Sequence, residues 1–194
     1  SVNVISLDDF YYSSPQLDIS MIGNPWKVPR GLPGSHSIIE LKTAIRRYIE
    51  TGKLEAPQFD KSLRNGLGDR SGTIQSTPQV LILEGWFLGC KNSNPNIINI
   101  EKDLSPPLTD KEKAYRKIVQ NKLIEYQPIW DILNNIWHIK ANSFSYTKLW
   151  KTEQEMNLLK RKGSSLSGDR LDSFIRMINA SFPQNSLQNI EAKV

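Results

Sequence analysis

The sequence predicts an α/β fold with a mainly parallel sheet, for three reasons. Two short apolar segments, at residues 2–7 and 80–83, have the length and β-branched composition of strands that are buried on both faces in a parallel sheet. Helical patterns follow them, so strands and helices alternate along the chain. The 194 residues, of which 38% are hydrophobic, match one globular domain in size and composition. Because no composition shift or repeat divides the chain, we expect a single domain over residues 1–194.

In the first half of the chain, each expected element has a local cause. Seven Pro and Gly residues between 13 and 37 predict a long loop, and loops of this length in compact domains often carry function. Apolar residues recur at helical spacing over 38–51, and Gly52 suits the left-handed position that ends many helices. A second loop is expected over 56–78, before the apolar strand at 80–83.

The second half is predicted to be richer in helix. Thr109 and Glu112 have the spacing of a capping box, which predicts the start of a helix there. Pro128 is expected to interrupt this helix, with one or two further turns at 129–133. The remaining expected elements are a strand at 137–141, a helix at 145–161, a flexible link at 163–168, a helix around 171–178 and the start of a strand at 189–194.

Composition and charge exclude several classes of protein. No apolar run approaches the roughly 18 residues that a membrane helix needs. The net charge of +5 suits either nucleic acid or anionic small molecules, but no strand interleaves basic and aromatic residues as a nucleic-acid stacking platform does. With a single cysteine the chain forms no internal disulfide, which favours a reducing, cytoplasmic compartment. We therefore expect no membrane and no nucleic-acid partner.

Acidic residues follow both apolar strands. Asp8 and Asp9 come directly after the first strand, and Glu84 comes directly after the second. In open parallel sheets, ligands bind at the carboxyl ends of the strands. Carboxylates that meet at one such edge suit Mg²⁺ binding and general-base chemistry on a hydroxyl group. A turn cap is the alternative role for an Asp in this position.

Five short blocks occur in a fixed order between Ser6 and about Pro183. They are residues 6–11, 30–36, 59–62 with 68–70, 83–89 and 150–155. Together they resemble the D-glycerate 3-kinases of plants, fungi and cyanobacteria, which are related to uridine kinase, phosphoribulokinase and pantothenate kinase. The resemblance implies a three-layer P-loop kinase fold. It also implies ATP-dependent phosphorylation of D-glycerate to 3-phosphoglycerate, with ATP and Mg²⁺ as cofactors.

The resemblance assigns roles to individual residues. Asp8 matches the general base of the family, and Glu84 is expected to hold Mg²⁺ or its water molecules together with Asp8. Lys151 and Arg161 lie in a lid-like region at about 145–168, and they are expected to reach the phosphates. The resemblance implies that six residues bind the acceptor: Tyr11, Arg30, His36, Asp60, Lys61 and Arg70. The basic side chains among them suit the carboxylate of the acceptor.

Two features depart from the family pattern. Residue 151 is Lys where the family usually has Arg, so the charge is kept but the planar pair of donors is lost. No Gly-x-x-x-x-Gly-Lys-Ser/Thr run occurs in the sequence, although in the family this phosphate-binding loop precedes the strand matched by residues 2–7. We therefore expect an incomplete fold that lacks its first strand, ends within a strand, and has no kinase activity on its own.

Two other interpretations stay open. A kinase of the same fold with another acceptor, such as a nucleoside, pantothenate or another sugar acid, would fit the same residues. A catalytically silent protein that binds a small anion or a partner protein would fit the missing loop. A screen of acceptors separates a kinase with another acceptor from a D-glycerate kinase. Residues upstream of Ser1 that complete the phosphate-binding loop would exclude the catalytically silent protein.

Overall fold

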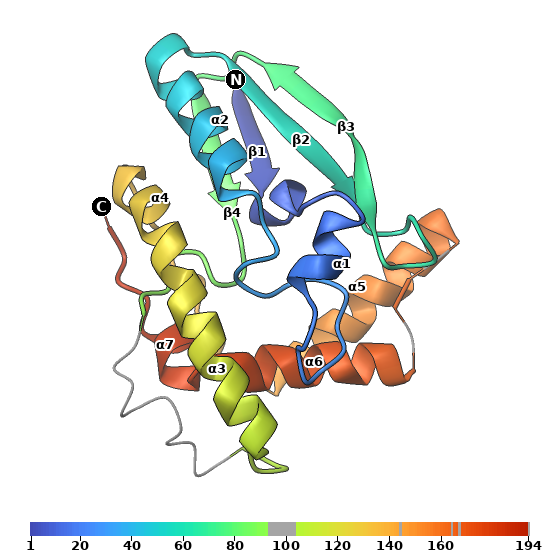
Figure 1. Cartoon of the computed structure of the whole chain (residues 1–194). Coiled ribbons are helices and arrows are strands. Elements are labelled where there is room, and N and C mark those ends of the chain that lie inside the picture. Colours follow the sequence, from blue (N-terminus) through green and yellow to red (C-terminus); the bar gives the residue numbers. More distant parts are fainter. Residues whose placement is uncertain (93–103, 144, 164, 167, 194) are drawn as a thin grey trace. The chain divides into compact units, whose positions relative to one another are not determined.

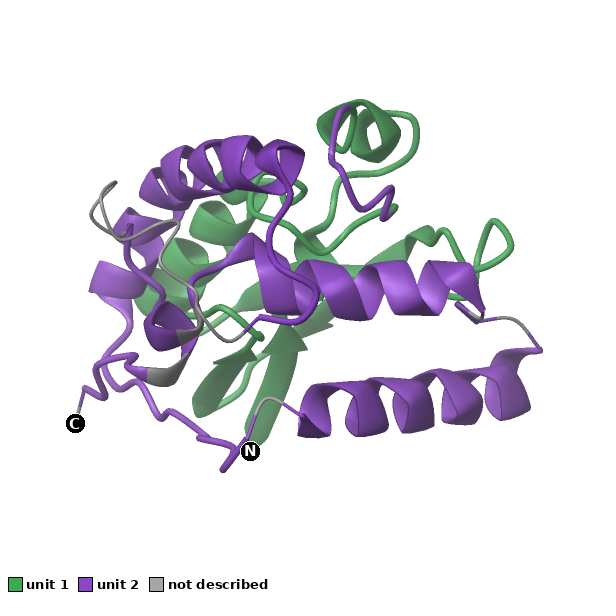
Figure 2. Cartoon of the chain, turned by 90° about the horizontal axis from the view of Figure 1, so that it is seen from below, with its two compact units in different colours: residues 1–22, 29–88 green, residues 23–28, 89–194 purple. Residues whose placement is uncertain are grey.

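The computed structural model describes most of the chain (Figure 1). The described residues are 1–92, 104–143, 145–163, 165–166 and 168–193. Contacts between residues divide the chain into two compact units, each with its own buried apolar residues (Figure 2). Unit 1 comprises residues 1–22 and 29–88, and unit 2 comprises residues 23–28 and 89–194. The single domain expected over residues 1–194 stays a prediction. In the described part, no helix is both long enough and apolar enough to cross a bilayer.

Unit 1 contains a parallel pair of strands. β1 (Val2–Ser6) and β4 (Val80–Glu84) lie side by side with Ser6 opposite Glu84, so their carboxyl ends are level (Figure 1). Both apolar segments are therefore strands, as predicted. The α/β class with parallel strands is confirmed.

One face of this pair is exposed, whereas the sequence predicted strands buried on both faces. Val2, Val4, Val80 and Ile82 share that face and are 62, 57, 50 and 45% exposed, whereas Ile5 on the opposite face is 2% exposed. An uninterrupted apolar strand shows that both faces can be buried, but what covers each face depends on other elements. The prediction of burial on both faces is wrong for the described residues.

An antiparallel hairpin replaces most of the loop predicted over 56–78. β2 (Leu54–Asp60) pairs with β3 (Asp69–Ser76), and the ladder contains one irregularity. Pro57 lies in β2 and Gly72 in β3, and both residue types are unfavourable in strand interiors. The sequence pattern therefore favoured a loop over two strands. The loop prediction is wrong here except for the turn between the two strands.

The predicted helix at 38–51 is confirmed as α2 (Ile38–Thr51). Ser37 is its N-cap and accepts a hydrogen bond from the Glu40 amide at 3.4 Å. Gly52 ends it with φ of 69°, in the left-handed region that glycine adopts without strain. A short helix, α1 (Gln16–Ser20), interrupts the loop predicted over 13–37.

Unit 2 is helical over most of its described residues. α3 (Asp110–Leu123) begins at the predicted capping box, in which Thr109 and Glu112 bond to each other's main-chain amides. A 3-10 turn, η2 (Ile124–Tyr126), follows, and Pro128 then lies in the first turn of α4 (Gln127–Ile132), where a missing N–H costs little. The predicted interruption and the additional turns are confirmed. The other helices are α5 (Tyr146–Lys162), α6 (Asp169–Ser181) and α7 (Gln184–Gln188).

The link predicted at 163–168 joins α5 to α6. Gly163 ends α5 with φ of 73°. The main-chain amide of Leu166 donates to Glu155 on α5 at 2.9 Å, which ties the middle of the link to that helix. Residues 164 and 167 lie outside the described residues.

Two strands predicted in unit 2 are not formed by the described residues. Residues 137–141 are irregular, and Ile139 is 97% exposed. Of the strand predicted at 189–194, the described residues form one isolated bridge, from Lys193 to Ile136. Alternating apolar residues favour a strand only where a partner supplies a ladder. These two predictions are wrong for the residues described.

Glu112 is the centre of a buried polar network in unit 2. The side chain of Trp26 donates to its Oε1 at 2.7 Å, and Arg176 donates to both carboxylate oxygens at 2.8 and 2.9 Å. The Thr109 amide donates to Oε2 at 2.8 Å. Burial raises the pKa of Glu112, but Arg176, Thr109 and Trp26 outweigh that effect and lower the pKa to about 2.

The free energy of unfolding is expected to fall between about pH 4.5 and pH 2 because of Glu112. The unfolded carboxyl has an ordinary pKa of 4.5, so the stabilising contribution is complete above that pH and is lost as the pH falls through the folded value of about 2. Urea unfolding of wild type and Glu112→Gln across this pH range measures the contribution of Glu112 to the free energy of unfolding. The difference between the two proteins should shrink toward pH 2, and an unchanged difference would contradict the assignment. Glu125→Gln, on an exposed side chain, is the control.

Candidate active site

The turn that carries Asp8 and Asp9 follows directly from β1. It is a 3-10 turn, η1 (Leu7–Phe10), whose N-cap is Ser6. The Ser6 hydroxyl accepts from the Asp8 amide at 3.2 Å, and Asp9 Oδ2 accepts from the Ser6 amide at 3.0 Å. The other Asp9 oxygen accepts from the Phe59 amide at 3.4 Å. Asp9 is therefore the capping residue, and the Asp8 carboxylate makes its contacts elsewhere.

Four side chains of unit 1, which we call the Asp8 cluster, meet at the end of β1. They are Asp8, Tyr11, His36 and Lys61. Lys61 Nζ lies 2.6 Å from Asp8 Oδ2, the Tyr11 hydroxyl donates to Oδ1 at 2.8 Å, and His36 Nε2 lies 3.9 Å from Oδ1. The side chains of Asp8 and Lys61 are 22 and 28% exposed, whereas that of His36 is fully buried. Solvent therefore reaches the cluster through Asp8 and Lys61.

Main-chain and aromatic contacts fix the buried half of the cluster. Tyr11 and His36 form an isolated β-bridge, and their rings stack with centroids 4.4 Å apart. Phe59 packs edge-on against Tyr11 at 5.0 Å, and Phe87 packs against His36 at 5.8 Å. This enclosure leaves the two rings little freedom, so they hold the Asp8 carboxylate in one orientation.

Arg30 and Asp60 hold the turn that carries Lys61. Asp60 Oδ1 accepts from the amide and hydroxyl of Ser62 at 2.9 and 2.6 Å, as in an Asx turn. Arg30 is buried and donates through Nη1 to two main-chain carbonyls of the same turn, at 2.8 and 2.7 Å. Both residues thus position Lys61, and their expected contact with the acceptor itself stays a prediction.

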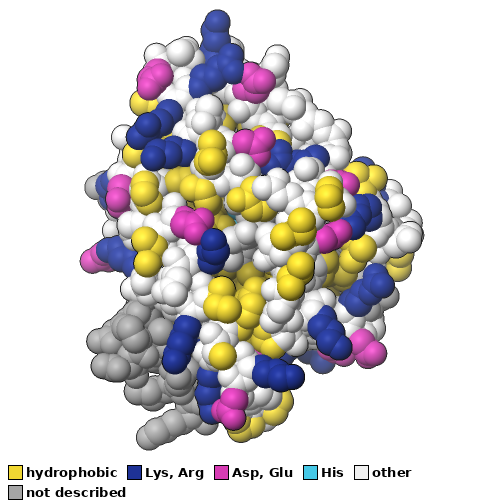
Figure 3. Space-filling view, viewed as in Figure 1, with side chains coloured by type: hydrophobic (Ala, Val, Ile, Leu, Met, Phe, Trp, Pro, Cys, Tyr) yellow, Lys and Arg dark blue, Asp and Glu magenta, His cyan; other side chains and the backbone are white. Residues whose placement is uncertain are grey.

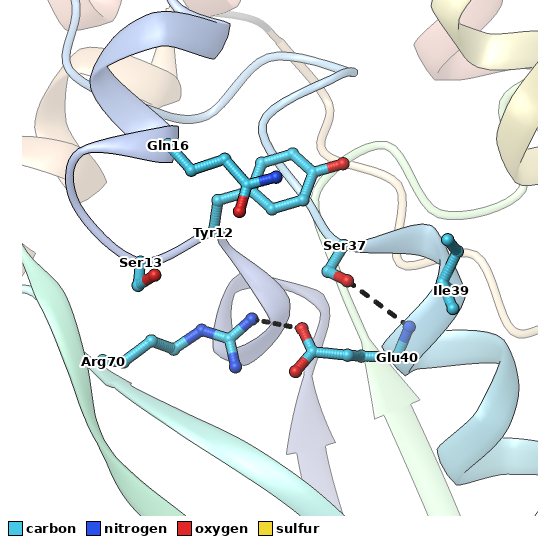
Figure 4. A pocket seen from close by; sticks show the side chains of 7 residues that line it. All are labelled: Tyr12, Ser13, Gln16, Ser37, Ile39, Glu40 and Arg70. Atoms are coloured by element: carbon cyan, nitrogen blue, oxygen red, sulfur yellow. Dashed lines mark hydrogen bonds and ion pairs between the residues drawn. The ribbon is translucent and has the colours of Figure 1, made fainter.

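Arg70 binds the chain that leaves η1 and lines a separate pocket. Its Nε donates to the Tyr11 carbonyl, and its Nη2 pairs with Glu40 at 2.7 Å (Figure 4). The pocket is open and measures about 340 Å³. None of the Asp8 cluster lines it. The lining residues are Tyr12, Ser13, Gln16, Ser37, Ile39, Glu40 and Arg70.

The charges of the cluster keep Asp8 ionised and His36 neutral. Burial raises the pKa of Asp8, but the Lys61 ammonium group and His36 outweigh it, so the pKa lies well below its usual range. Burial lowers the pKa of His36 from its usual 6.5, and Lys61 lowers it further, against the opposing effect of Asp8. At neutral pH the cluster is a carboxylate held by one ammonium group and two polar rings.

Glu84 lies at the same edge of the sheet as η1, because it is opposite Ser6 in the ladder. A Cβ added to Gly85 would lie 2.9 Å from Leu7 Cβ, so the missing side chain lets the two strand ends approach. Glu84 is exposed, and no described side chain pairs with its carboxylate. Within the described residues no group of three or more His, Cys, Asp or Glu could hold a metal, so the Mg²⁺ site of Glu84 and Asp8 stays a prediction.

The two residues predicted to reach the phosphates lie on α5, in unit 2. Lys151 Nζ is 2.6 Å from Glu155 Oε1 and 4.6 Å from the centroid of the Phe174 ring, and its side chain is 10% exposed. Arg161 is exposed near the end of the helix. Lys151 therefore has partners within its own unit, and the phosphate contacts of both residues stay predictions.

The sequence interpretation missed the aromatic enclosure by Phe59 and Phe87, whose only signal was their position in the blocks that contain Lys61 and Glu84. The capping role of Asp9 is the alternative that the sequence left open, and the spacing from Ser6 to an acid three residues later is a known capping pattern.

The chain has curated relatives that are kinases. No protein-family model matches it. The uncharacterized kinase mug58 of Schizosaccharomyces pombe is 26% identical over 192 residues, which cover 90% of this chain and 66% of that protein. The chloroplastic D-glycerate 3-kinase of Arabidopsis thaliana is 27% identical over 184 residues, covering 88% of this chain and 38% of that protein. The probable ATP-dependent kinase TDA10 of Saccharomyces cerevisiae is 28% identical, covering 90% of this chain and 63% of that protein.

Solved structures establish the fold. D-glycerate 3-kinase from Cryptococcus neoformans var. grubii matches with a TM-score of 0.79 at 22% identity, over 98% of this chain and 72% of that one. The YGR205w protein matches with a TM-score of 0.61 at 26% identity, over 97% of this chain and 71% of that one. The predicted α/β kinase fold is confirmed.

The chain is thus a homologue of small-molecule kinases. D-glycerate 3-kinase is among these homologues, as the resemblance of the sequence blocks predicted. The chain spans between 38 and 66% of the length of the curated relatives that it matches.

Proposed function

We propose that this chain contributes the acceptor site of a kinase that phosphorylates D-glycerate with ATP, with Asp8 as the general base. The observation that carries the proposal is the Asp8 cluster. It holds an ionised, partly exposed carboxylate at the carboxyl end of a parallel strand, beside a lysine suited to an acidic acceptor. D-glycerate 3-kinases among the homologues support glycerate as that acceptor.

In this mechanism Asp8 accepts the proton of the acceptor hydroxyl while the hydroxyl oxygen attacks the γ-phosphorus atom of ATP. The new oxygen–phosphorus bond forms as the bond to the β-phosphate oxygen breaks, and ADP leaves with that electron pair. Tyr11 and His36 orient the carboxylate, and Lys61 binds the carboxylate of the acceptor. Arg30 and Asp60 act through the turn that they hold.

The residues at the sheet edge suit a magnesium ion. Mg²⁺ typically binds one or two protein carboxylates and fills its other positions with water and phosphate oxygens. Glu84 and Asp8 would provide these carboxylates, and Glu84 has no competing partner among the described residues. The ion would neutralise charge on the phosphates during transfer.

Charge distribution favours a small-molecule partner over nucleic acid. On the face shown in Figure 3, Lys and Arg side chains are spread out and lie among acidic ones. Arg47, which follows Arg46 in the sequence, pairs with Glu55. The absence of a nucleic-acid partner and a cytoplasmic location stay predictions.

Measuring ADP release by the full-length natural protein tests the proposed function. D-glycerate is expected to give the highest kcat/KM among D-glycerate, glycerol, pantothenate and uridine, and EDTA is expected to abolish turnover. A higher value with pantothenate or uridine would contradict the acceptor. No ADP release with any acceptor would favour the silent, anion-binding alternative. The 194 residues assayed alone serve as the control, and they are expected to be inactive because their sequence contains no phosphate-loop motif.

A further inference from the structure

One guanidinium group, that of Arg70, joins three elements of unit 1. Its Nε donates to the main-chain carbonyl of Tyr11, the C-cap of η1, and its Nη2 donates to the carbonyl of Phe10 at 3.4 Å. The same Nη2 pairs with Glu40, in the first turn of α2, at 2.7 Å (Figure 4). Because Arg70 itself lies in β3, the hairpin, the end of η1 and the start of α2 meet at this group.

The segment that Arg70 holds carries the residue that orients Asp8. The Tyr11 hydroxyl donates to Asp8 Oδ1 at 2.8 Å. That hydroxyl stands at the far end of a ring enclosed by His36 and Phe59, whose ring centroids lie 4.4 and 5.0 Å away. Since the enclosed ring has little freedom of its own, the main chain of Tyr11 decides where the hydroxyl lies. A shift of that main chain would carry the hydroxyl away from Oδ1.

The contacts of Arg70 go to protein groups, although the sequence predicted a contact with the acceptor. Two of its three guanidinium nitrogens donate to main-chain carbonyls and Glu40, and its side chain lines the separate pocket, which none of the Asp8 cluster lines. Asp69, the residue before it, accepts from the Ser14 amide at 3.0 Å, so the start of β3 also binds the chain that follows Tyr11. This arrangement suits the fixing of a segment.

We infer that Arg70 is a positioning residue of the acceptor site. It sets the Tyr11 hydroxyl against Asp8 and thereby the orientation of the carboxylate, and Glu40 supports it by holding Nη2. This inference rests on the proposed function, in which Asp8 must face the acceptor hydroxyl in the transition state. Loss of Arg70 therefore lowers kcat and leaves the binding of D-glycerate nearly unchanged, because the contacts of the acceptor itself remain.

A double-mutant cycle with Tyr11→Phe in the full-length protein tests the inference. Arg70→Met and Tyr11→Phe are each expected to lower kcat for D-glycerate about 10-fold, the cost of losing one hydrogen bond to a charged group. The double variant should also lose about 10-fold, because both changes remove the same contact. A loss of about 100-fold in the double variant, as for independent effects, would overturn the inference. So would a loss in Arg70→Met that appears as weaker binding of D-glycerate in calorimetry with kcat unchanged.

Two further variants complete the cycle. Glu40→Gln weakens the support of Arg70 on a side chain that is 52% exposed, so it gives the answer if Arg70→Met does not fold. It should lower kcat about 2- to 5-fold, and this loss should disappear in the Tyr11→Phe protein. Arg47→Met is the matched control, because Arg47 also links α2 to the hairpin through an ion pair, with Glu55. It should leave kcat unchanged.

A second measurement does not depend on turnover. In protein with ¹³Cζ-labelled tyrosine, each signal reports the hydrogen bond of one hydroxyl, and the Tyr11 signal is the one that Tyr11→Phe removes. Arg70→Met should move this signal toward that of tyrosine in water, and Arg47→Met should leave it in place. An unchanged Tyr11 signal in Arg70→Met would show that Arg70 does not position the hydroxyl.

The two tests separate the positioning role from the proposed function. If the Tyr11 signal stays in place in a protein that phosphorylates D-glycerate, the positioning role is wrong and the kinase function stands. If Arg70→Met moves the signal but no acceptor is phosphorylated by the wild type, Arg70 positions Tyr11 and the kinase function is wrong.

Discussion

Asp8→Asn is expected to lower kcat for D-glycerate phosphorylation in the full-length protein by about a hundred- to ten-thousand-fold, the usual cost of removing a general base. Asparagine has nearly the same shape and still accepts the hydrogen bond from Tyr11, but it cannot take up a proton. The buried rings of Tyr11 and His36 should keep the turn in place. The loss is therefore expected in kcat, with a smaller change in the dissociation constant of D-glycerate.

Steady-state kinetics and calorimetric binding of D-glycerate measure the two quantities separately. Asp18→Asn is the matched control, because Asp18 is an exposed carboxylate of the same unit that pairs with Arg64. It should leave kcat unchanged. Asp9→Asn leaves one accepting oxygen for the Ser6 and Phe59 amides, and its main effect should be a loss of about 1 kcal/mol in the free energy of unfolding. If Asp8→Asn keeps more than about a tenth of wild-type kcat, a general base at this position is ruled out.

Arg116→Met is expected to destabilise unit 2 by about 2–4 kcal/mol, which makes it the largest stability effect that we predict. Arg116 is fully buried on α3, and its Nε and Nη2 donate to the carbonyls of Ala180 and Phe182, the latter at 3.0 Å. These carbonyls lie at the C-terminal end of α6, where the helix supplies no partner for them. Methionine fills much of the space but leaves both carbonyls buried without these donors.

Urea unfolding of wild type and Arg116→Met at neutral pH measures the effect. Arg170→Met is the control, because Arg170 is exposed on α6 and should change the free energy of unfolding by less than about 0.5 kcal/mol. A loss below about 1 kcal/mol for Arg116→Met would show that other donors satisfy the end of α6.

Local patterns predicted much of the fold. β1, β4 and α2 were predicted because each carries its own signal, namely a β-branched apolar run or a helical period that ends at Gly52. The start of α3 was predicted from the capping box at Thr109, whose contacts lie within one turn. These signals depend on neighbouring residues, which a sequence shows directly.

The missed elements depend on distant partners. The β2–β3 hairpin is held by main-chain pairing across a turn, and its side chains show no clear alternation. Residues 137–141 carry alternating apolar side chains but find no ladder among the described residues. The exposed face of β1 and β4 is a third case, since strand composition does not show what covers a face.

For the site, sequence blocks predicted which residues lie near one another but not which atoms meet. Asp8, expected to be the base, forms one cluster with three residues expected to bind the acceptor, namely Tyr11, His36 and Lys61, and these roles stay predictions. Arg30 was predicted beside them as an acceptor contact, yet its guanidinium group binds carbonyls of the Lys61 turn. Which way a side chain points depends on packing around it, and short motifs carry no such information.

Mapping bound D-glycerate by NMR in the full-length protein tests the central claim most directly. The claim is that the acceptor binds at the Asp8 cluster of unit 1. We expect D-glycerate to shift the side-chain signals of Tyr11, His36 and Lys61, with smaller shifts at Tyr12 and Gln16 in the separate pocket. Shifts confined to that pocket or to unit 2, with the Asp8 cluster unchanged, would contradict the assignment of the active site.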